Sequence, residues 1–296
     1  MTTIQPPVGY IGLGLMGGPM SLRLLGAGYT VNVWNRSSDK MVKIVAAGAV
    51  PQTSPAAVAK ASQFVFMCLT DTKAVEDVVF GKDGIASVPG AGKILCDFSS
   101  MRPDATQEFG NRLKLANGMG WVDAPVSGGV PGAEQGTLAI MAGGEAADVE
   151  QVRPAVMAMA QRFTHMGPAG AGQVTKLCNQ MIVSSNMLTI AEAIAFAQKA
   201  GIAAERLPEA LKGGFADSTP LQLLAPRFAK QQYDPPLGQL YTMVKDLATV
   251  RDTARKNGAP IPMVALVAEM MQNLMARGHG DDDITVLSKL YLPNKL

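Results

Sequence analysis

The sequence predicts an α/β N-terminal domain followed by an all-helical C-terminal domain, joined by one long helix. Three observations support this fold class. The first half alternates short apolar runs with amphipathic helical stretches, a pattern typical of βαβ units and a parallel sheet. The second half contains helical patterns without strand-like runs. Between them, residues 173–200 form an apolar helical pattern roughly 40 Å long at about 1.5 Å per residue, too long for one small domain.

The domain division is expected near Gly167, where the periodicity changes. The chain has 296 residues, which corresponds to about two domains at ~150 residues each. Residues 1–166 are the predicted α/β domain, and residues 167–296 the predicted all-helical domain. Hydrophobic residues make up 48% and charged residues 17%, which favours packed cores over disorder.

The elements of the first half follow in order from apolar runs and their boundaries. Ser37 or Ser38 is the expected cap of a helix that ends before Gly48. Further strand-like runs past Trp121 are expected to extend the sheet. We expect strands at 8–13, 30–34, 64–69, 93–98, 121–126 and 138–142, and helices at 19–27, 38–47 and 73–80.

The second half reads as a series of helices. The long helix carries apolar residues at helical spacing, which predicts a buried stripe made of Val174, Leu177, Cys178, Met181, Ile182, Ile190 and Ile194. A last helix is expected behind the cap Asp281–Asp283. The other predicted helices are 207–212, 221–229, 239–256 and 263–276.

Charge and targeting signals exclude several classes of protein. The formal net charge is +2 and there is no Lys/Arg run, which argues against a nucleic-acid partner. Residues 1–7 lack the basic flank and apolar stretch of a secretory signal. The apolar segment 181–200 contains several polar side chains, so no membrane span is expected there. The expected location is the cytoplasm.

Cysteines and histidines give no signal for a disulfide framework or a metal site. Cys68, Cys96 and Cys178 lie far apart and form no C-x-x-C pair. His165 has no neighbour at metal-ligand spacing. His279 precedes three aspartates, but a helix cap is the more common explanation of that cluster. No metal site is expected.

The segment Gly12-Leu13-Gly14-Leu15-Met16-Gly17 follows a predicted strand and opens a predicted helix. Glycines at this spacing allow a tight turn, close approach of the backbone to a pyrophosphate, and close packing of helix on strand. The helix start adds N–H groups and the positive end of its dipole. All six residues are therefore candidate cofactor contacts, against the alternative of a merely glycine-rich turn.

The end of the second predicted strand indicates which nicotinamide cofactor binds. An acidic residue about 20 positions after the glycines would bind the adenosine ribose of NAD. Asn35 and Arg36 stand there instead. Arg36 can pair with a 2′-phosphate, and Asn35 can hydrogen-bond either form of the ribose, which favours NADP over NAD. The alternative is that Arg36 is a solvated surface residue.

Two further segments suggest a substrate site. Ser127, Gly128 and Gly129 end a strand-like run, and a hydroxyl with two unobstructed N–H groups suits a small carboxylate, although an ordinary turn explains the same residues. Lys176 and Asn179 are three apart on the long helix, so they share a face. Apolar neighbours leave Lys176 partly desolvated, which favours proton transfer; an exposed helical lysine is the alternative. Lys245, next to Asp246, is a further candidate, against an exposed ion pair.

Together these motifs resemble the β-hydroxyacid dehydrogenase family, which includes 3-hydroxyisobutyrate dehydrogenase and tartronate semialdehyde reductase. The resemblance rests on residues 12–17, 123–129, 172–180 and 245–247, in that order, and covers essentially the whole chain. It implies a Rossmann-type domain, a helical domain, an active site in the cleft between them, and dimers or tetramers. It also implies hydride transfer between a nicotinamide cofactor and a small 3-hydroxy acid or aldehyde acid.

The resemblance assigns roles residue by residue. It implies that Lys176 is the proton donor or acceptor, that Asn179 orients the substrate, and that residues 127–129 hold its carboxylate. Lys245 would contact substrate or cofactor. Ser100 matches a cofactor-contacting threonine of the family, with Leu69 and Thr70 nearby.

Two positions depart from a single subfamily pattern. Gln180 stands where 3-hydroxyisobutyrate dehydrogenases usually carry a second Asn, and the Asn-Gln pair is more similar to tartronate semialdehyde reductase. Asn35-Arg36 instead resembles the NADP-using glyoxylate and succinic semialdehyde reductases. The substrate therefore stays open among these aldehyde acids. A non-catalytic nicotinamide-binding sensor and an imine reductase on the same fold are the alternatives.

Overall fold

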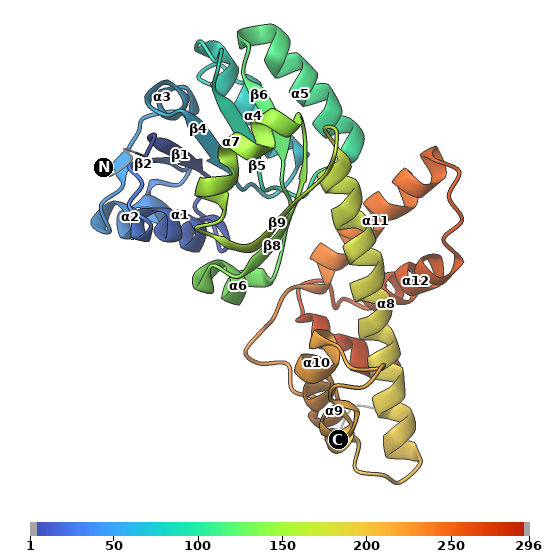
Figure 1. Cartoon of the computed structure of the whole chain (residues 1–296). Coiled ribbons are helices and arrows are strands. Elements are labelled where there is room, and N and C mark those ends of the chain that lie inside the picture. Colours follow the sequence, from blue (N-terminus) through green and yellow to red (C-terminus); the bar gives the residue numbers. More distant parts are fainter. Residues whose placement is uncertain (1–4, 293–296) are drawn as a thin grey trace. The chain divides into compact units, whose positions relative to one another are not determined.

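A computed structural model describes residues 5–292, so residues 1–4 of the N-terminal segment discussed above lie outside it. The chain divides into two compact units, one ending at Lys176 and the other beginning at Leu177 (Figure 1). The division lies within helix α8 (Ala171–Lys199), which confirms the predicted long helix. The domain boundary expected at 166/167 stays a prediction.

Within residues 5–292, nine strands form one sheet in the order β3-β2-β1-β4-β5-β6-β8-β7, with β9 paired to β8. The first six strands in this order are parallel, as predicted. The order reverses between β1 and β4, the point where α/β sheets bind ligands. β8 runs antiparallel to β6 and β7, and parallel to β9. The bounds are β1 Val8–Ile11, β2 Val31–Trp34, β3 Val50–Pro51, β4 Phe64–Met67, β5 Ile94–Asp97, β6 Gly120–Asp123, β7 Val126–Ser127, β8 Leu138–Gly143 and β9 Ala160–Gly167.

Helices cover both faces of this sheet because strand side chains alternate between the faces. In β4, Phe64 and Phe66 join the core beneath α1, α2, α6 and α7. Val65 and Met67 join the core beneath α3, α4 and α5. The bounds are α1 Gly17–Gly26, α2 Val42–Ala46, α3 Pro55–Ala61, α4 Thr72–Phe80, α5 Pro103–Asn117, α6 Gly129–Gln135 and α7 Ala146–Val156.

The helix expected at 38–47 begins differently from the prediction. A 3₁₀ turn over Ser38–Met41 precedes α2, and the Ser37 side chain makes no capping hydrogen bond. The Ser37 carbonyl accepts from Lys40 N at 3.2 Å and from Asn35 Nδ2 at 2.9 Å. The i→i+3 bond to Lys40 defines the tighter turn, so capping by Ser37 was a wrong prediction.

The C-terminal unit consists of helices joined by loops, with no strand within its described residues, 177–292, and its predicted helices are confirmed. Its core gathers apolar side chains from α8, α10, α11 and α12, among them Ile194, Phe228, Leu247 and Met271. The last helix is a 3₁₀ helix, because Asp283 accepts from the Thr285 amide and its own carbonyl bonds the Val286 amide. The bounds are α9 Leu207–Leu211, α10 Thr219–Lys230, α11 Leu240–Lys256 and α12 Pro262–Ala276, with 3₁₀ turns η3 Ala204–Arg206 and η4 Ile284–Leu290.

The apolar stripe predicted along α8 is only partly buried. Ile190 and Ile194 are buried, whereas Val174 and Ile182 are 44% and 69% exposed and Cys178 is exposed as well. Positions 174, 178 and 182 are four apart, so they form a row of their own along the helix. Among the described helices, α8 alone is long and apolar enough to cross a membrane, and 44% of that apolar window is buried within the fold.

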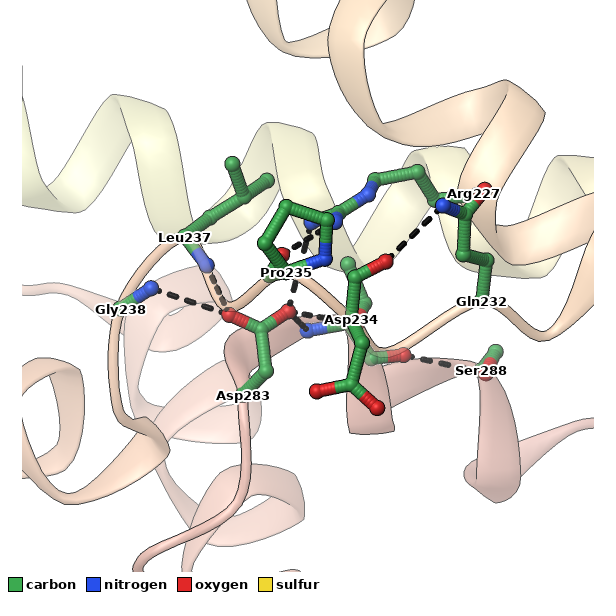
Figure 2. A network of polar contacts seen from close by, with 9 residues as sticks. Arg227, Gln232, Asp234, Pro235, Leu237, Gly238, Asp283 and Ser288 are labelled. Carbon is green, nitrogen blue, oxygen red and sulfur yellow. Dashed lines mark hydrogen bonds and ion pairs between the residues drawn. The ribbon is translucent and has the colours of Figure 1, made fainter. Parts of the chain in front are cut away.

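A buried ion pair anchors the loop that leads into α11 (Figure 2). Arg227 of α10 donates to the Pro235 carbonyl and lies 3.7 Å from Asp283, measured from Nη1 to Oδ1. Asp283 also accepts from the amides of Leu237 and Gly238. Burial alone would raise the pKa of Asp283, but these hydrogen bonds and those from Thr285 lower it below its ordinary value. The start of α11 is thereby held by charge-assisted hydrogen bonds.

Candidate active site

The glycine loop after β1 has the shape that the motif predicts. Gly12 adopts φ +89°, and a Cβ there would lie 2.3 Å from the Cys68 carbonyl oxygen. A Cβ on Gly17 would lie 1.9 Å from the Gly12 carbonyl oxygen. A Cβ on Gly14 would meet no protein atom within 4 Å. Packing therefore requires glycine at 12 and 17, while the open space at Gly14 suits the close approach of a ligand.

A cavity of about 470 Å³ adjoins this loop in the N-terminal unit. It lies at the carboxyl ends of β1, β2 and β4, the usual position of a dinucleotide in this fold. Arg36 and Leu69 line it, as expected, and so do Lys40 and Lys82, which sequence reasoning missed. Lys40 could have been recognised in the sequence as a second cation, four residues after Arg36. Asp77 and Asp83 line the cavity too, so its charged side chains carry a net positive charge. This charge and the glycine loop together fit a phosphate-bearing nicotinamide cofactor.

Asn35 joins the glycine loop to the end of β2. Its Oδ1 accepts from Leu13 N at 2.8 Å, and its Nδ2 donates to the Ser37 carbonyl at 2.9 Å. Of the other residues expected at the loop, Leu15 is exposed and Met16 directly precedes α1. The Asn35 side chain therefore holds the glycine loop in place, and Asn35 also lines the cavity.

Ser99 and its neighbours link β5 to the edge of the same cavity. The Leu69 amide donates to Ser99 Oγ at 2.9 Å. Ser100, the predicted cofactor contact, directly follows Ser99, is partly buried and is not among the residues that line the cavity. Ser99 was missed because the match to the family pointed to its neighbour.

Asp123 at the end of β6 caps the first turn of α8. Its Oδ1 accepts from Gly170 N at 2.7 Å and its Oδ2 from Gln173 N at 2.9 Å. Gln173 extends this network, because its Nε2 donates to the Ser99 carbonyl and its Oε1 accepts from Met101 N. Both side chains are buried, and burial raises the pKa of Asp123. The network holds the start of α8 against β5 and β6.

Asp97 lies beside Asp123 on the neighbouring strand, at the same register. Its Oδ1 accepts from Ser99 N at 2.9 Å, while its buried Oδ2 has no hydrogen-bond partner. Burial raises the pKa of Asp97 to about 7, with a smaller contribution from the charge of Asp123. Sequence reasoning assigned no role to Asp97. An acidic residue at the end of a buried strand was the only available signal.

Lys176 lies next to the predicted carboxylate-binding turn within the N-terminal unit. Its Nζ donates to the Val126 carbonyl at 2.9 Å, and its side chain is partly buried. The next residues are Ser127, Gly128 at φ +128° and Gly129 at φ +61°. Positive φ angles favour glycine, and glycine leaves the backbone amides of the turn uncovered by a side chain. The structure thus brings the candidate proton donor and the candidate anion site together.

The C-terminal unit brings together the other candidates. Asn179 Nδ2 donates to Gln180 Oε1 at 2.9 Å, and Gln180 Nε2 donates to Asp246 Oδ2 at 2.6 Å. Lys245 Nζ lies 3.8 Å from Asp246 Oδ1. Gln180 and Asp246 are each 8% exposed. A chain of polar contacts therefore connects the α8 motif with the α11 motif.

Within residues 5–292, no three His, Cys, Asp or Glu side chains gather as metal ligands would. His279 Nδ1 lies 2.7 Å from Asp282 Oδ2, and Asp283 caps η4.

Comparison with known proteins agrees with the fold and with the motifs. The family described as "NAD binding domain of 6-phosphogluconate dehydrogenase" matches residues 7–167. The family described as "NAD-binding of NADP-dependent 3-hydroxyisobutyrate dehydrogenase" matches residues 170–291. The chain is 35% identical to 2-hydroxy-3-oxopropionate reductase of Escherichia coli K12 over 95% of each chain.

Solved structures agree as well. Mycobacterium tuberculosis 3-hydroxyisobutyrate dehydrogenase with L-serine is 29% identical, has a TM-score of 0.86, and covers 97% of this chain and 99% of its own. An imine reductase variant from Myxococcus stipitatus with NAD⁺ is 18% identical, has a TM-score of 0.65, and covers 97% of this chain and 99% of its own. The second likeness concerns the fold alone.

The sheet order, glycine loop and basic cavity define a two-domain NAD(P)-dependent oxidoreductase. The chain belongs to the β-hydroxyacid dehydrogenase family, as the sequence motifs predicted. It is an enzyme that acts on CH–OH groups with a nicotinamide cofactor.

Proposed function

We propose that the chain reduces a short aldehyde acid to the corresponding hydroxy acid, with NADPH preferred over NADH and Lys176 as the proton donor. The observation that supports this most directly is the contact of Lys176 Nζ with the Val126 carbonyl at 2.9 Å. The contact holds an ammonium group beside the Ser127–Gly129 turn, where an anionic substrate would bind. The class includes tartronate semialdehyde, methylmalonate semialdehyde, glyoxylate and succinic semialdehyde.

In this mechanism each residue has one task. The Ser127 hydroxyl and the amides of Gly128 and Gly129 bind the substrate carboxylate. The bound dihydronicotinamide supplies the hydride. Lys176 stabilises the negative charge that develops on the carbonyl oxygen and transfers a proton from Nζ to it.

Asn179 and Lys245 have the remaining tasks in this proposal. The Asn179 amide orients the reacting oxygen, and Lys245 binds substrate or cofactor through its charge. In the direction of alcohol oxidation, the neutral amine of Lys176 accepts the proton. The residue types support each of these roles chemically, because an amide can donate and accept hydrogen bonds and an ammonium group binds anions.

The preference for NADPH is supported by the basic lining of the cavity. Arg36 and Lys40 line it together, near the end of β2 where the adenosine ribose lies in this fold. Two cations there can neutralise a 2′-phosphate, whereas no carboxylate stands at the end of β2 to bind the ribose of NAD.

Oxidation of NADPH and NADH, measured separately with each of the four aldehyde acids, tests the proposal. We expect turnover with at least one aldehyde acid and a higher kcat/KM with NADPH. Turnover only with a cyclic imine would identify an imine reductase instead. Tight NADPH binding without turnover on any of these compounds would identify a cofactor sensor.

We further propose a homodimer or homotetramer in the cytoplasm. Large apolar side chains on helices of the C-terminal unit are exposed, including Phe196, Leu223, Met263 and Leu266. Such side chains are commonly covered in oligomers. The three cysteines are unpaired, as is usual in a reducing compartment. Light scattering of the purified chain and fractionation of the source cells measure the two properties.

A further inference from the structure

The polar chain in the C-terminal unit has a fixed hydrogen-bond direction. A carboxylate only accepts hydrogen bonds, so the NH₂ group of Gln180 must face Asp246. The carbonyl oxygen of Gln180 then faces the other way, and it accepts from Asn179 Nδ2 at 2.9 Å. The NH₂ group of Asn179 is thereby turned toward Gln180. One glutamine side chain therefore sets the orientation of the amide at 179.

The same glutamine holds the Asp246–Lys245 pair on α11. Gln180 Nε2 donates to Asp246 Oδ2 at 2.6 Å, and the other carboxylate oxygen lies 3.8 Å from Lys245 Nζ. Both Gln180 and Asp246 are buried, with the Met243 sulfur 3.7 Å from the Gln180 amide nitrogen. A hydrogen bond to a charged group in such surroundings is worth more than one in water.

We propose that Gln180 is a positioning residue that couples Asn179 on α8 to Lys245 on α11, so that the two groups orient the substrate together. This inference rests on the proposed function, in which Asn179 and Lys245 handle the substrate. Gln180 itself contacts neither substrate nor cofactor in this scheme. It acts through its two neighbours in the chain of hydrogen bonds.

The length of the glutamine side chain is essential to the coupling. Asparagine keeps the amide but withdraws it by one carbon–carbon bond, about 1.5 Å. From an observed 2.6 Å, the contact with Asp246 would open beyond hydrogen-bonding distance. Gln180→Asn should therefore uncouple α8 from α11 while changing little volume.

The first experiment measures kcat and KM of the wild type and of Gln180→Asn on the aldehyde acid that the wild type turns over best. We expect kcat/KM to fall about ten- to hundredfold, as for a lost hydrogen bond to a charged group. NADPH should still bind, because the glycine loop and its cavity belong to the N-terminal unit. Gln198→Asn is the matched control: Gln198 is on the same helix, and its side chain donates to the Ala229 carbonyl. It should keep wild-type kinetics.

A charge-exchanged double variant separates positioning from general destabilisation. In Gln180→Glu, two carboxylates face each other, which should lower kcat more than Gln180→Asn does. In Gln180→Glu combined with Asp246→Asn, the amide at position 246 can donate to the carboxylate at position 180, and this carboxylate still accepts from Asn179. We expect the double variant to match Asp246→Asn alone in kcat. Circular dichroism and the Tm of each variant identify any that fails to fold.

The outcomes distinguish this inference from the proposed function. If the wild type turns over no aldehyde acid, the proposed function fails, and the coupling fails with it. If the wild type is active and Gln180→Asn retains full kcat and KM, only the coupling is overturned. The coupling is also overturned if Gln180→Glu lowers kcat by the same factor in the wild type and in the Asp246→Asn variant, because substitutions of coupled residues have non-additive effects.

Discussion

Two contacts, one in each unit, hold helix α8 by different chemistry. In the N-terminal unit, the Asp123 carboxylate binds main-chain amides of Gly170 and Gln173. In the C-terminal unit, the Gln180 side chain binds the Asp246 side chain. A contact to the backbone holds the helix start whatever side chains follow it, whereas a contact between side chains depends on both residue types. We infer that the first contact sets where the helix begins and that the second adjusts the orientation of single side chains.

The largest expected effect concerns Lys176, which follows the capped turn on α8. Lys176→Ala should lower kcat by about 10²- to 10⁴-fold, the usual contribution of a general acid. Pre-steady-state and steady-state kinetics with the best aldehyde acid measure it. Binding of NADPH should survive, since the glycine loop is untouched. Full turnover in this variant would remove Lys176 from the mechanism.

The next expected effect concerns stability, when the Asp123 carboxylate that caps α8 is removed. Asp123→Ala leaves the amides of Gly170 and Gln173 without their acceptor in a buried position, so we expect a loss of about 2–4 kcal/mol in the free energy of unfolding. Urea unfolding, followed by the fluorescence of Trp34 and Trp121, both in the N-terminal unit, measures the loss. The corresponding change in the C-terminal unit, Asp246→Ala, should leave the urea transition of the N-terminal unit in place. Equal shifts of that transition in both variants would contradict the comparison.

Cofactor preference should respond to a change in the N-terminal unit alone. Arg36→Asp replaces a cation that lines the cavity with the acidic residue that favours NAD. We expect kcat/KM for NADPH to fall at least about tenfold, as for loss of one charge-assisted contact, and the order of NADPH and NADH to reverse. The KM for the aldehyde acid serves as the internal control. An unchanged cofactor ratio would refute the role of Arg36.

Asp97 should contribute a pH dependence of stability. Burial raises its pKa from an ordinary value of 3.8 to about 7, so the folded chain keeps a proton that the unfolded chain releases between these values. Stability should therefore fall as pH rises from about 4 to 7 and then level off. Asp97→Asn should flatten this slope in Tm measured from pH 4 to 8. The exposed Asp39→Asn is the control, and an identical slope in Asp97→Asn and wild type would contradict the assignment.

Much of the fold could be predicted because local signals agreed with the tertiary structure. The strands of the parallel sheet and the helices of the C-terminal unit follow the apolar periodicity. The helices α3, α5, α6 and α7 and the strands β3 and β9 were not assigned individually, because they are short or their patterns are weak or interrupted by glycine and proline. The exposed row of Val174, Cys178 and Ile182 could not be recognised either. Periodicity shows that residues share a face, and not what covers that face.

The candidate site divides in the same way. The glycine loop, Arg36 and Lys176 were recognisable from residues close in sequence. The contacts that cap α8 and join it to α11 link residues distant in sequence: Asp123 contacts residues 47 and 50 positions away, and Gln180 contacts one 66 positions away. Nothing in the local sequence around Asp123 or Gln180 indicates these partners.

By itself, the sequence determined the alternation of strands and helices, the shape of the phosphate-binding turn and the residue types available for catalysis. These properties depend on neighbours within a few positions, through side-chain periodicity and the conformational freedom of glycine. Only the tertiary structure decided that Asp123 caps α8, that Asp97 is buried with one carboxylate oxygen lacking a hydrogen-bond partner, and that the Gln180 amide joins α8 to α11. Those contacts depend on strand register and on the rotation of packed helices, and both arise when the whole unit buries its apolar faces.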